Sequence, residues 1–333
     1  MVTSRDVAKL AGVSQPTVSR ALRDDPRLSP ATKDVVRKAA RQLGYATNAI
    51  GRALATGRST RVGLLVTDLQ NEFYPHVIAP MHHELAELGH ELVLITETVE
   101  AEVIAERIVA HGLCGVILAT PRLESLLPVR LDDKGIPFVY FNRVSSLVHA
   151  DSVTVDPSVG FADLADALVR LGHTRIGAVF GPQDTSTGAL RERAVRAALA
   201  ARGLGFDEAD VRHGDFDFEV GHTHGRDLLG SSDRPSVIIC ANDIVALGVL
   251  NAAAEEGLEV PADVSVVGFD DLPIAGWPLV QMTTIRYDLD AMSRSAARLM
   301  VRRVGLADGA EPTSETFPTA YVERRTLGAA PPS

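Results

Sequence analysis

The stretch DVAKLAGVSQPTVSRAL, residues 6–22, decides the fold of the N-terminus because it encodes two short helices around a glycine turn. Thr3 lies three residues before Asp6, a spacing in which the Thr hydroxyl caps the first helix and the Asp carboxylate faces its positive end. The helix then continues through apolar positions to Leu10 and is expected to stop at Gly12.

Two more helices follow this start. Ser14 caps a helix over residues 15–22, and Pro16 falls in its first turn, where a missing N–H costs nothing. Residues 29–30, Ser-Pro, repeat this device for a third helix that ends at Gly44. Helix, tight turn, helix and supporting helix form the helix-turn-helix plan. The alternative is a generic three-helix bundle with ordinary caps, which so specific a pattern disfavours.

The charge of the chain is divided unevenly. The 333 residues have a net charge of −10, but residues 1–58 hold 11 basic and 4 acidic side chains and therefore carry +7, which leaves −17 on the rest. A basic module on an acidic body attracts phosphate while discouraging indiscriminate binding. The alternative is a chance cluster of solvated charges.

The cysteines and the apolar runs indicate the cellular compartment in which the protein works. Cys114 and Cys240 are the two cysteines of the chain and both lie in apolar runs, so a disulfide scaffold and a Cys-rich zinc site are excluded. No run approaches 18 apolar residues and residues 1–12 lack an apolar signal core. We therefore expect a cytoplasmic protein.

The second helix carries side chains suited to reading bases. Gln pairs bidentately with adenine and Arg with guanine, while Pro16 offers an apolar surface for a thymine methyl. Hydroxyls near helix N-termini can donate to phosphates. The residues expected to contact DNA are Thr3, Ser14, Gln15, Pro16, Thr17, Arg20, Arg23, Ser29, Tyr45, Asn48 and Leu54.

The sequence resembles the LacI/GalR (lactose-repressor) family of bacterial regulators. The likeness rests on DVA at 6–8, AGVS at 11–14, TVSR at 17–20, LGY at 43–45 and NAIGRALA at 48–55, and continues through nearly the whole body. It implies a hinge that folds into a helix on specific DNA, where the leucine matching Leu54 is a wedge in the minor groove, as apolar wedges generally unstack a base step.

The hinge departs from the family pattern at two positions. Thr47 stands where proline is frequent, and Gly51 stands where alanine is usual. Glycine costs a helix roughly 0.8–1 kcal/mol relative to alanine. We therefore expect this hinge to be unusually disordered away from DNA, so that operator binding must drive its folding.

From residue 61 the pattern changes to alternating strands and helices. Apolar runs at 62–66, 91–95, 115–119, 137–141, 175–180, 236–241 and 264–269 alternate with helical stretches at 75–88, 101–111, 158–171, 188–202, 220–229 and 242–256. Such runs predict parallel α/β sheets buried on both faces. In open sheets of this kind ligands bind beyond the carboxyl ends of the strands.

Planar hydrogen-bonding side chains and aromatic rings gather after these strands. This combination suits a sugar or a small polar metabolite, whereas each residue alone could be a loop cap or a core edge. In the resembling family most of the matching positions line an effector cleft. The expected effector residues are Asp68, Phe73, Tyr74, Asn142, Arg143, Arg191, Phe216, Asn242, Asp270 and Trp277.

The resemblance also implies the organisation of the chain. It indicates a head at 1–46, a hinge helix and linker at 47–60, and an effector-binding and dimerisation domain at 61–328 that resembles type I periplasmic sugar-binding proteins. The chain would cross three times between two doubly wound α/β subdomains, about 61–158 plus 288–318 and 159–287 plus 319–328. The segment at 282–286 resembles the return crossing.

Other functions have less support. The acidic pair Asp270 and Asp271 could form a catalytic dyad and His82, His83, His222 and His224 could bind metal, but adjacent carboxylates usually point apart and nothing completes a zinc site. Phosphate-binding and nucleophile motifs are missing, including the D-x-G-[ST] loop of sugar kinases. A transport protein would have no use for residues 1–58.

The expected protein is therefore a regulator and not an enzyme, with no cofactor and no metal. Its partners are operator DNA, a small effector and a second copy of the chain, because a near-palindromic operator matches a two-fold symmetric homodimer. Arg143 and Arg191 would serve a sugar, a sugar acid or a phosphorylated sugar equally well. We expect the protein to repress transcription until a sugar binds and releases it from the operator. The alternative is co-repression, in which the effector strengthens operator binding.

Overall fold

The computed structural model describes residues 2–22, 25–45, 59–66, 69, 71–96, 99–231, 233–306 and 310–331. Its contacts divide the chain into two units, Met1–Ser59 and Thr60–Ser333, called the head and the body below. The hinge helix expected within 47–60 falls on residues outside the described ranges up to residue 58, as do Arg23, Asn48, Leu54 and Asp68.

The head consists of three helices, α1 (Ser4–Ala11), α2 (Gln15–Leu22) and α3 (Pro30–Gln42). The first helix begins with the expected capping box: the Asp6 amide donates to Thr3 Oγ1 at 3.4 Å, and the Thr3 amide donates to Asp6 Oδ2 at 2.8 Å. It ends at Gly12, whose φ of 63° is in the left-handed region that glycine adopts without strain. Local chemistry therefore sets both ends of this helix.

A small apolar core holds the three helices together. Val7, Val18 and Val36, one from each helix, are fully buried and pack in one cluster with four alanines. Ser29 caps α3, since its Oγ accepts a hydrogen bond from the Thr32 amide at 3.2 Å. This arrangement confirms the helix-turn-helix head.

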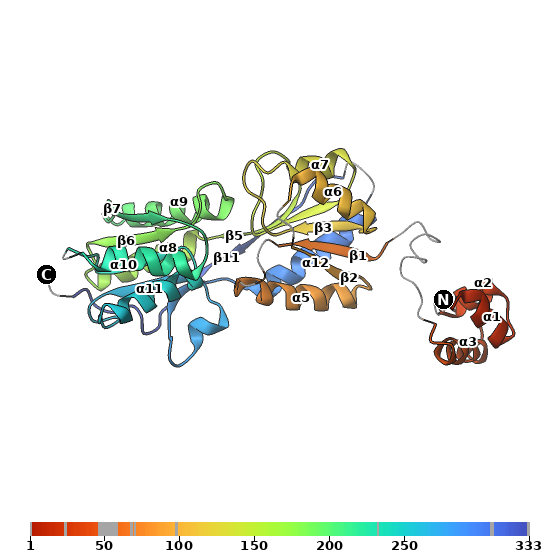
Figure 1. Ribbon diagram of the computed structural model, residues 1–333. Coiled ribbons are helices and arrows are strands. Elements are labelled where there is room, and N and C mark those ends of the chain that lie inside the picture. The colour runs from red at the N-terminus through yellow and green to blue at the C-terminus, as the bar shows by residue number, and fades with distance from the viewer. Residues whose placement is uncertain are drawn as a thin grey trace. The chain divides into compact units, whose positions relative to one another are not determined.

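The first subdomain of the body is a six-stranded sheet in the order β11-β5-β4-β3-β1-β2, with every neighbouring pair parallel (Figure 1). Helices α5 and α12 pack with the residues of one face, and α6 and α7 with those of the other. Its elements are β1 (Arg61–Leu65), α5 (Phe73–Glu87), β2 (Glu91–Ile95), α6 (Ala101–Ala110), β3 (Gly115–Leu118), α7 (Leu127–Asp133), β4 (Phe138–Phe141), β5 (Asp151–Asp156), α12 (Leu289–Gly305) and β11 (Ser314–Pro318).

The second subdomain is a sheet in the order β12-β10-β9-β8-β6-β7, parallel except for the pair β10 and β12. Helices α8 and α9 cover one face, and α10 and α11 the other (Figure 1). Its elements are α8 (Ser158–Arg170), β6 (Ile176–Phe180), α9 (Ser186–Ala200), β7 (Phe206–His213), α10 (Phe218–Leu229), β8 (Val237–Cys240), α11 (Asp243–Glu255), β9 (Ser265–Asp270), the 3-10 helix η1 (Pro273–Gly276), β10 (Thr283–Arg286) and β12 (Ala320–Val322).

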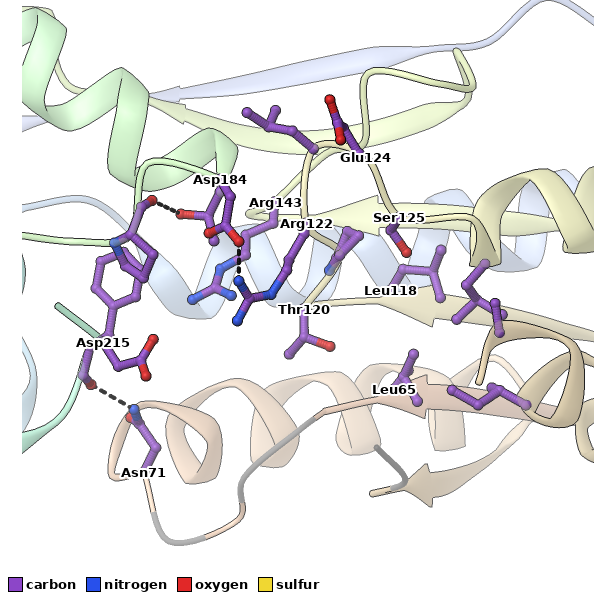
Figure 2. A pocket seen from close by; sticks show the side chains of 18 of the residues that line it. Leu65, Asn71, Leu118, Thr120, Arg122, Glu124, Ser125, Arg143, Asp184 and Asp215 are labelled. Atoms are coloured by element: carbon purple, nitrogen blue, oxygen red, sulfur yellow. Dashed lines mark hydrogen bonds and ion pairs between the residues drawn. The ribbon is translucent and has the colours of Figure 1, made fainter. Parts of the chain in front are cut away.

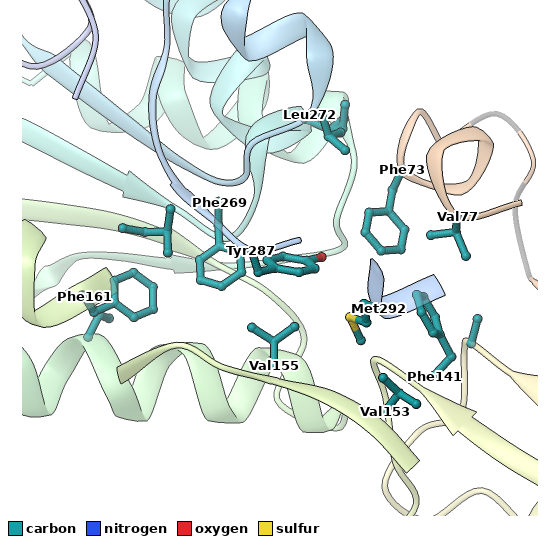
Figure 3. Close-up of a cluster of buried hydrophobic side chains, with 14 of the residues drawn as sticks. Phe73, Val77, Phe141, Val153, Val155, Phe161, Phe269, Leu272, Tyr287 and Met292 are labelled. Carbon is teal, nitrogen blue, oxygen red and sulfur yellow. The ribbon is translucent and has the colours of Figure 1, made fainter. Parts of the chain in front are cut away.

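The chain passes between the two sheets three times, from β5 to α8, from β10 to α12 and from β11 to β12. Near these crossings the ring of Phe269 packs between Phe161 and Tyr287, at centroid distances of 5.5 and 6.0 Å (Figure 3). A doubly wound sheet with three crossings is the α/β architecture expected for the body, and this fold class is confirmed.

The structure contains elements beyond those that the apolar runs indicate. Strand β7 follows the sequence FDEADVRH at the edge of its sheet and is half exposed, so it lacks a continuous apolar run. Strand β5 alternates polar and apolar residues, and α12 interleaves arginines with its buried apolar residues. Of the described helices, none is both long and apolar enough to cross a membrane.

Candidate functional site

A cleft of about 1080 Å³ lies between the two subdomains of the body. Loops after β1, β3 and β4 line one wall, and the loops after β6 and β7 line the other, so the cleft opens at the carboxyl ends of the strands (Figure 2). The inner end continues into a space of about 30 Å³, called the floor below, which Asn142, Arg191, Asn242 and Asp270 help to line. The strand-end rule therefore located the cleft.

A buried ion pair forms part of the floor. Nη2 of Arg191 lies 2.8 Å from Oδ1 of Asp270, which also accepts a hydrogen bond from the Tyr287 hydroxyl at 3.0 Å. Nη1 of Arg191 donates to the carbonyl of Ala241 at 2.7 Å, and its guanidinium lies 3.8 Å from the centroid of Phe269. Burial raises the pKa of Asp270, and the positive charge of Arg191 opposes this rise. Each member of the ion pair is therefore held in place by further contacts.

An aromatic ring separates the floor from the wider cleft. Phe216 lies below the guanidinium of Arg143, 5.0 Å from the ring centroid, and beside that of Arg191 at 5.9 Å. The ring has room because Gly181 follows β6; a Cβ there would lie 2.3 Å from Phe216 Cζ. Such a ring offers a flat apolar face to the apolar side of a sugar.

Arg143 differs from Arg191 in its partners. Its guanidinium has no hydrogen bond or ion pair within the described ranges of the chain. Burial lowers the pKa of Arg143, and the nearby positive charges of Arg191 and Arg122 act in the same direction. Arg143 is therefore a desolvated cation available to a bound molecule.

Asn242 and Asp243 hold the loop after β8. Asn242 Oδ1 accepts from the Val245 amide at 2.8 Å and so caps α11. Asp243 is fully buried and accepts hydrogen bonds from the Thr284 hydroxyl at 2.6 Å and the Leu272 amide at 2.7 Å. Burial, together with the neighbouring charge of Asp270, raises the pKa of Asp243. These contacts fix the end of β9, where Asp270 lies.

Two bridges join the walls of the cleft. Arg122 and Asp184 form an ion pair (Figure 2). The Leu123 amide donates to the Asp184 carbonyl at 2.8 Å. Nearer the floor, Asn71 Nδ2 donates to the carbonyl of Phe216 at 3.0 Å (Figure 2). A change in the spacing of the subdomains would have to break these bonds.

Most of the expected effector residues meet at the floor, but one does not. Phe73, Tyr74, Asn142, Arg143, Arg191, Phe216, Asn242 and Asp270 all line it, whereas Asp68 lies outside the described residues. Trp277 is 57% exposed and does not line the cleft, so its assignment there is corrected. The chain turns through η1 after β9 and carries Trp277 away from the strand end.

Several cleft residues were missed by the sequence interpretation. Arg122 and Glu124 follow β3, and the strand-end rule applied to that strand would have found them. Thr187 lies in the first turn of α9 and lines the floor. Asp215 and Asp217 both lie in the cleft wall, and Asp217 also caps α10. The two acidic residues of the pair after β9 point to different partners, Asp270 to Arg191 and Asp271 to Arg324.

The head presents an exposed row of side chains on α2. Gln15, Pro16 and Arg20 are exposed, and Gln15 Nε2 donates to Ser4 Oγ at 2.9 Å. The Ser14 hydroxyl bonds to that of Thr17 at 2.8 Å at the start of the helix. Thr3 and Ser29 lie at the N-termini of α1 and α3, and Tyr45 packs half-buried against the core.

Comparison with known protein families matches both units. Residues 3–48 match the family described as "Bacterial regulatory proteins, lacI family", and residues 165–327 match the "Periplasmic binding protein-like domain".

Curated relatives are similar over almost the whole chain. The HTH-type transcriptional regulator CelR of Thermobifida fusca is 33% identical over 307 residues, which cover 90% of each protein. The HTH-type transcriptional regulator MalR of Streptomyces coelicolor is 33% identical and covers 90% of this chain and 89% of its own. The ribose operon repressor of Escherichia coli is 31% identical, covering 91% and 93%.

Solved structures agree with the sequence relatives. A complex of the transcriptional regulator CelR with cellobiose has a TM-score of 0.74 and 31% identity, covering 98% of this chain and all of that one. The lac repressor dimer bound to operator and the anti-inducer ONPF has a TM-score of 0.86 and 25% identity, covering 98% and 99%.

Proposed function

Because the chain belongs to the LacI family of bacterial transcriptional regulators, we propose that the cleft of its body binds a small effector that controls the affinity of its head for operator DNA. The observation that carries this proposal is the floor, where planar polar groups converge on a space beside Phe216. Residues 1–46 would read DNA, 47–60 would form the hinge, and 61–328 would bind effector and dimerise.

The effector is inferred to be a sugar or a sugar derivative. Hydroxyls of a pyranose would pair with Asn142, Asn242 and the arginines, while its apolar face would pack on Phe216. CelR in complex with cellobiose is a relative with a sugar in its structure. Thermal-shift screening of carbohydrates, repeated with operator present, tests this: a sugar that stabilises the body and shifts operator affinity is expected, and no response to any carbohydrate would contradict it.

The chain is inferred to be a regulator without catalytic activity that works in the cytoplasm, where operator DNA is found. Two of the carboxylates in this region are already engaged: Asp270 with Arg191 and Tyr287, and Asp217 as the cap of α10. Bound sugar should therefore be recovered unchanged, and turnover would contradict this inference.

We propose that α2 is the helix that reads the operator bases. Gln15, Pro16 and Arg20 would face the major groove, while the hydroxyls of Thr3, Ser14, Thr17 and Ser29 would bind phosphates. Arg23, Tyr45, Asn48 and Leu54 complete the proposed set.

Arg20→Ala is expected to weaken operator binding by about 1–3 kcal/mol and to relax the preference at one base position, because a bidentate contact to guanine is lost. Selection from a random operator library, sequenced before and after binding, measures this. The control is Arg41→Ala, which removes the same charge from an exposed site on α3 and should leave the base preferences unchanged. A wild-type preference profile for Arg20→Ala would refute the assignment.

The protein is proposed to act as a homodimer, as in the operator complex of the lac repressor. The loop after η1 exposes Trp277 (57%) and Leu279 (100%), and adjacent large apolar side chains on a surface indicate a contact site. We infer that a second copy covers them.

Trp277→Asp combined with Leu279→Asp is expected to convert the dimer to a monomer and to weaken operator binding sharply, because burying two carboxylates in the interface is costly. Sedimentation velocity measures the oligomeric state. Val159→Asp, at a 53% exposed site in the first turn of α8, is the control and should remain dimeric. A dimeric double variant would move the interface elsewhere.

A further inference from the structure

A second cavity of about 200 Å³ adjoins the floor of the cleft and is called the hinge chamber here. Its apolar lining comes from five side chains of the loop after β4, the crossing from β5 to α8, helix α9 and strand β9: Val144, Val155, Pro157, Leu190 and Phe269. Both subdomains therefore contribute walls, and Figure 3 shows Val155 and Phe269 close together in this region. The chamber has a largely apolar surface, unlike the polar floor.

The wall between the chamber and the floor is made of three polar residues. Asn142, Thr187 and Arg191 line both spaces, so the cleft, the floor and the chamber follow one another toward the crossings. Arg191 is occupied by Asp270 and the Ala241 carbonyl. The other two residues are not satisfied in this way.

Two buried polar atoms in this wall have no hydrogen-bond partner within the described residues, Asn142 Oδ1 and Thr187 Oγ1. Thr187 is only 7% exposed, in the first turn of α9. Asn142 has a φ of 64°, and its backbone N–H donates to the Val153 carbonyl at 2.8 Å. The backbone of Asn142 is therefore anchored in a left-handed conformation. A buried polar group without a partner is destabilising, because it has lost its hydrogen bonds to water. The two unpaired atoms therefore indicate a bound ligand.

The size and lining of the chamber suit an aromatic ring. An apolar cavity of about 150 Å³ is known to stay dry and to bind benzene, and the hinge chamber is somewhat larger. A ring that carries one oxygen could pack on Val155, Leu190 and Phe269 while that oxygen reaches the polar wall. A free hydroxyl would donate to Asn142 Oδ1 and accept from the Thr187 hydroxyl.

We propose that the hinge chamber binds a one-ring aromatic group attached to an oxygen. In a phenol the hydroxyl would donate to Asn142 Oδ1 and accept from Thr187, whereas the ether oxygen of an aryl glycoside would accept from Thr187 alone. This site goes beyond the sugar-binding cleft, and binding of free phenol requires neither DNA nor a sugar. Because both subdomains form its walls, an occupied chamber favours the subdomain spacing seen here.

The test is thermal unfolding of the full chain with phenol and with toluene. Phenol at about ten times its Kd should raise the melting temperature of the body by about 3 °C, and toluene, which lacks the oxygen, should bind more weakly. Val144→Phe fills the chamber and should abolish the phenol shift, whereas Val148→Phe, further along the same loop and outside the chamber lining, should retain it.

A second variant separates the polar wall from the apolar lining. Thr187→Val removes a hydroxyl that has no partner among the described residues, so the variant should unfold at the same temperature as the wild type or higher. It should weaken phenol binding about fivefold and leave toluene binding unchanged. Equal losses for the two ligands would overturn the role of the wall.

A comparison of phenol with glycosides shows whether the aromatic ring belongs to a free phenol or to the aryl group of a glycoside. A larger shift with phenyl β-D-glucopyranoside than with phenol, and none with the methyl glucoside, would assign the chamber to the aryl group of an effector. A shift with free phenol alone would assign it to a separate molecule. No shift with either aromatic ligand, or a phenol shift that survives in Val144→Phe, would overturn the proposal, while a carbohydrate response would still support the cleft.

Discussion

Asp270→Ala is expected to lower the free energy of unfolding of the body by about 3–5 kcal/mol, because it leaves the guanidinium of Arg191 buried without its counter-charge. Asp270 and Arg191 are only 3% and 7% exposed, so their charges are largely removed from screening by water. Tyr287 would lose its hydrogen-bond acceptor as well. Urea unfolding followed by circular dichroism measures the loss.

Two further variants separate the charge effect from simple truncation. Arg191→Met combined with Asp270→Leu removes both charges, and it should recover most of the lost stability, since apolar replacement of a buried pair is often neutral or stabilising. Asp227→Ala removes a carboxylate that is 58% exposed in its ion pair with Arg212, and should cost less than about 1 kcal/mol. A single variant as stable as the wild type would show that Arg191 finds another partner.

This result also changes how the effector site has to be tested. From the sequence alone, Asp270→Ala is expected to leave operator affinity intact while abolishing the response to effector. The structure adds the stability loss, which would confuse that measurement. Asp270→Asn also removes the counter-charge of Arg191, but it keeps an acceptor for Tyr287 and the size of the side chain. Its stability loss should therefore be smaller, which makes it the better probe of effector response.

Gly221→Ala is expected to destabilise the body by about 3 kcal/mol. A Cβ at this position would lie 2.0 Å from the carbonyl oxygen of Val245 and 2.8 Å from its carbon. These are backbone atoms of the adjoining helix α11, so no side-chain rotation relieves the clash, and overpacking of this kind costs about 1–3 kcal/mol or more. The better helix propensity of alanine returns only about 1 kcal/mol.

The matched control is Gly205→Ala, in the loop before β7. In the part of the chain that the structure describes, no heavy atom lies within 4 Å of a Cβ at this position, and the φ of Gly205 is not in the left-handed region. This variant should be as stable as the wild type or slightly more stable, because alanine restricts the unfolded chain. Equal urea midpoints for the two glycine variants would show that α10 and α11 can move apart.

The head was accessible to sequence interpretation because its signals are local. Thr3 and Asp6 are three residues apart, and Ser29 caps a helix that begins at the next residue. The expected second helix has the same bounds as α2, and the expected strand at 91–95 has those of β2. Caps, turns and short apolar runs act over a few residues, so their pattern determined the head, the alternation of strands and helices in the body, and the family.

Only the tertiary structure decided which of these residues meet. Arg191 and Asp270 are 79 positions apart, and Phe216 reaches Arg143 from the other subdomain. Trp277 follows a buried strand as closely as a cleft residue would, yet the turn through η1 exposes it. Whether a side chain faces a cleft, a partner charge or water depends on the crossing of distant segments, and a pattern that extends over a few residues does not encode that crossing.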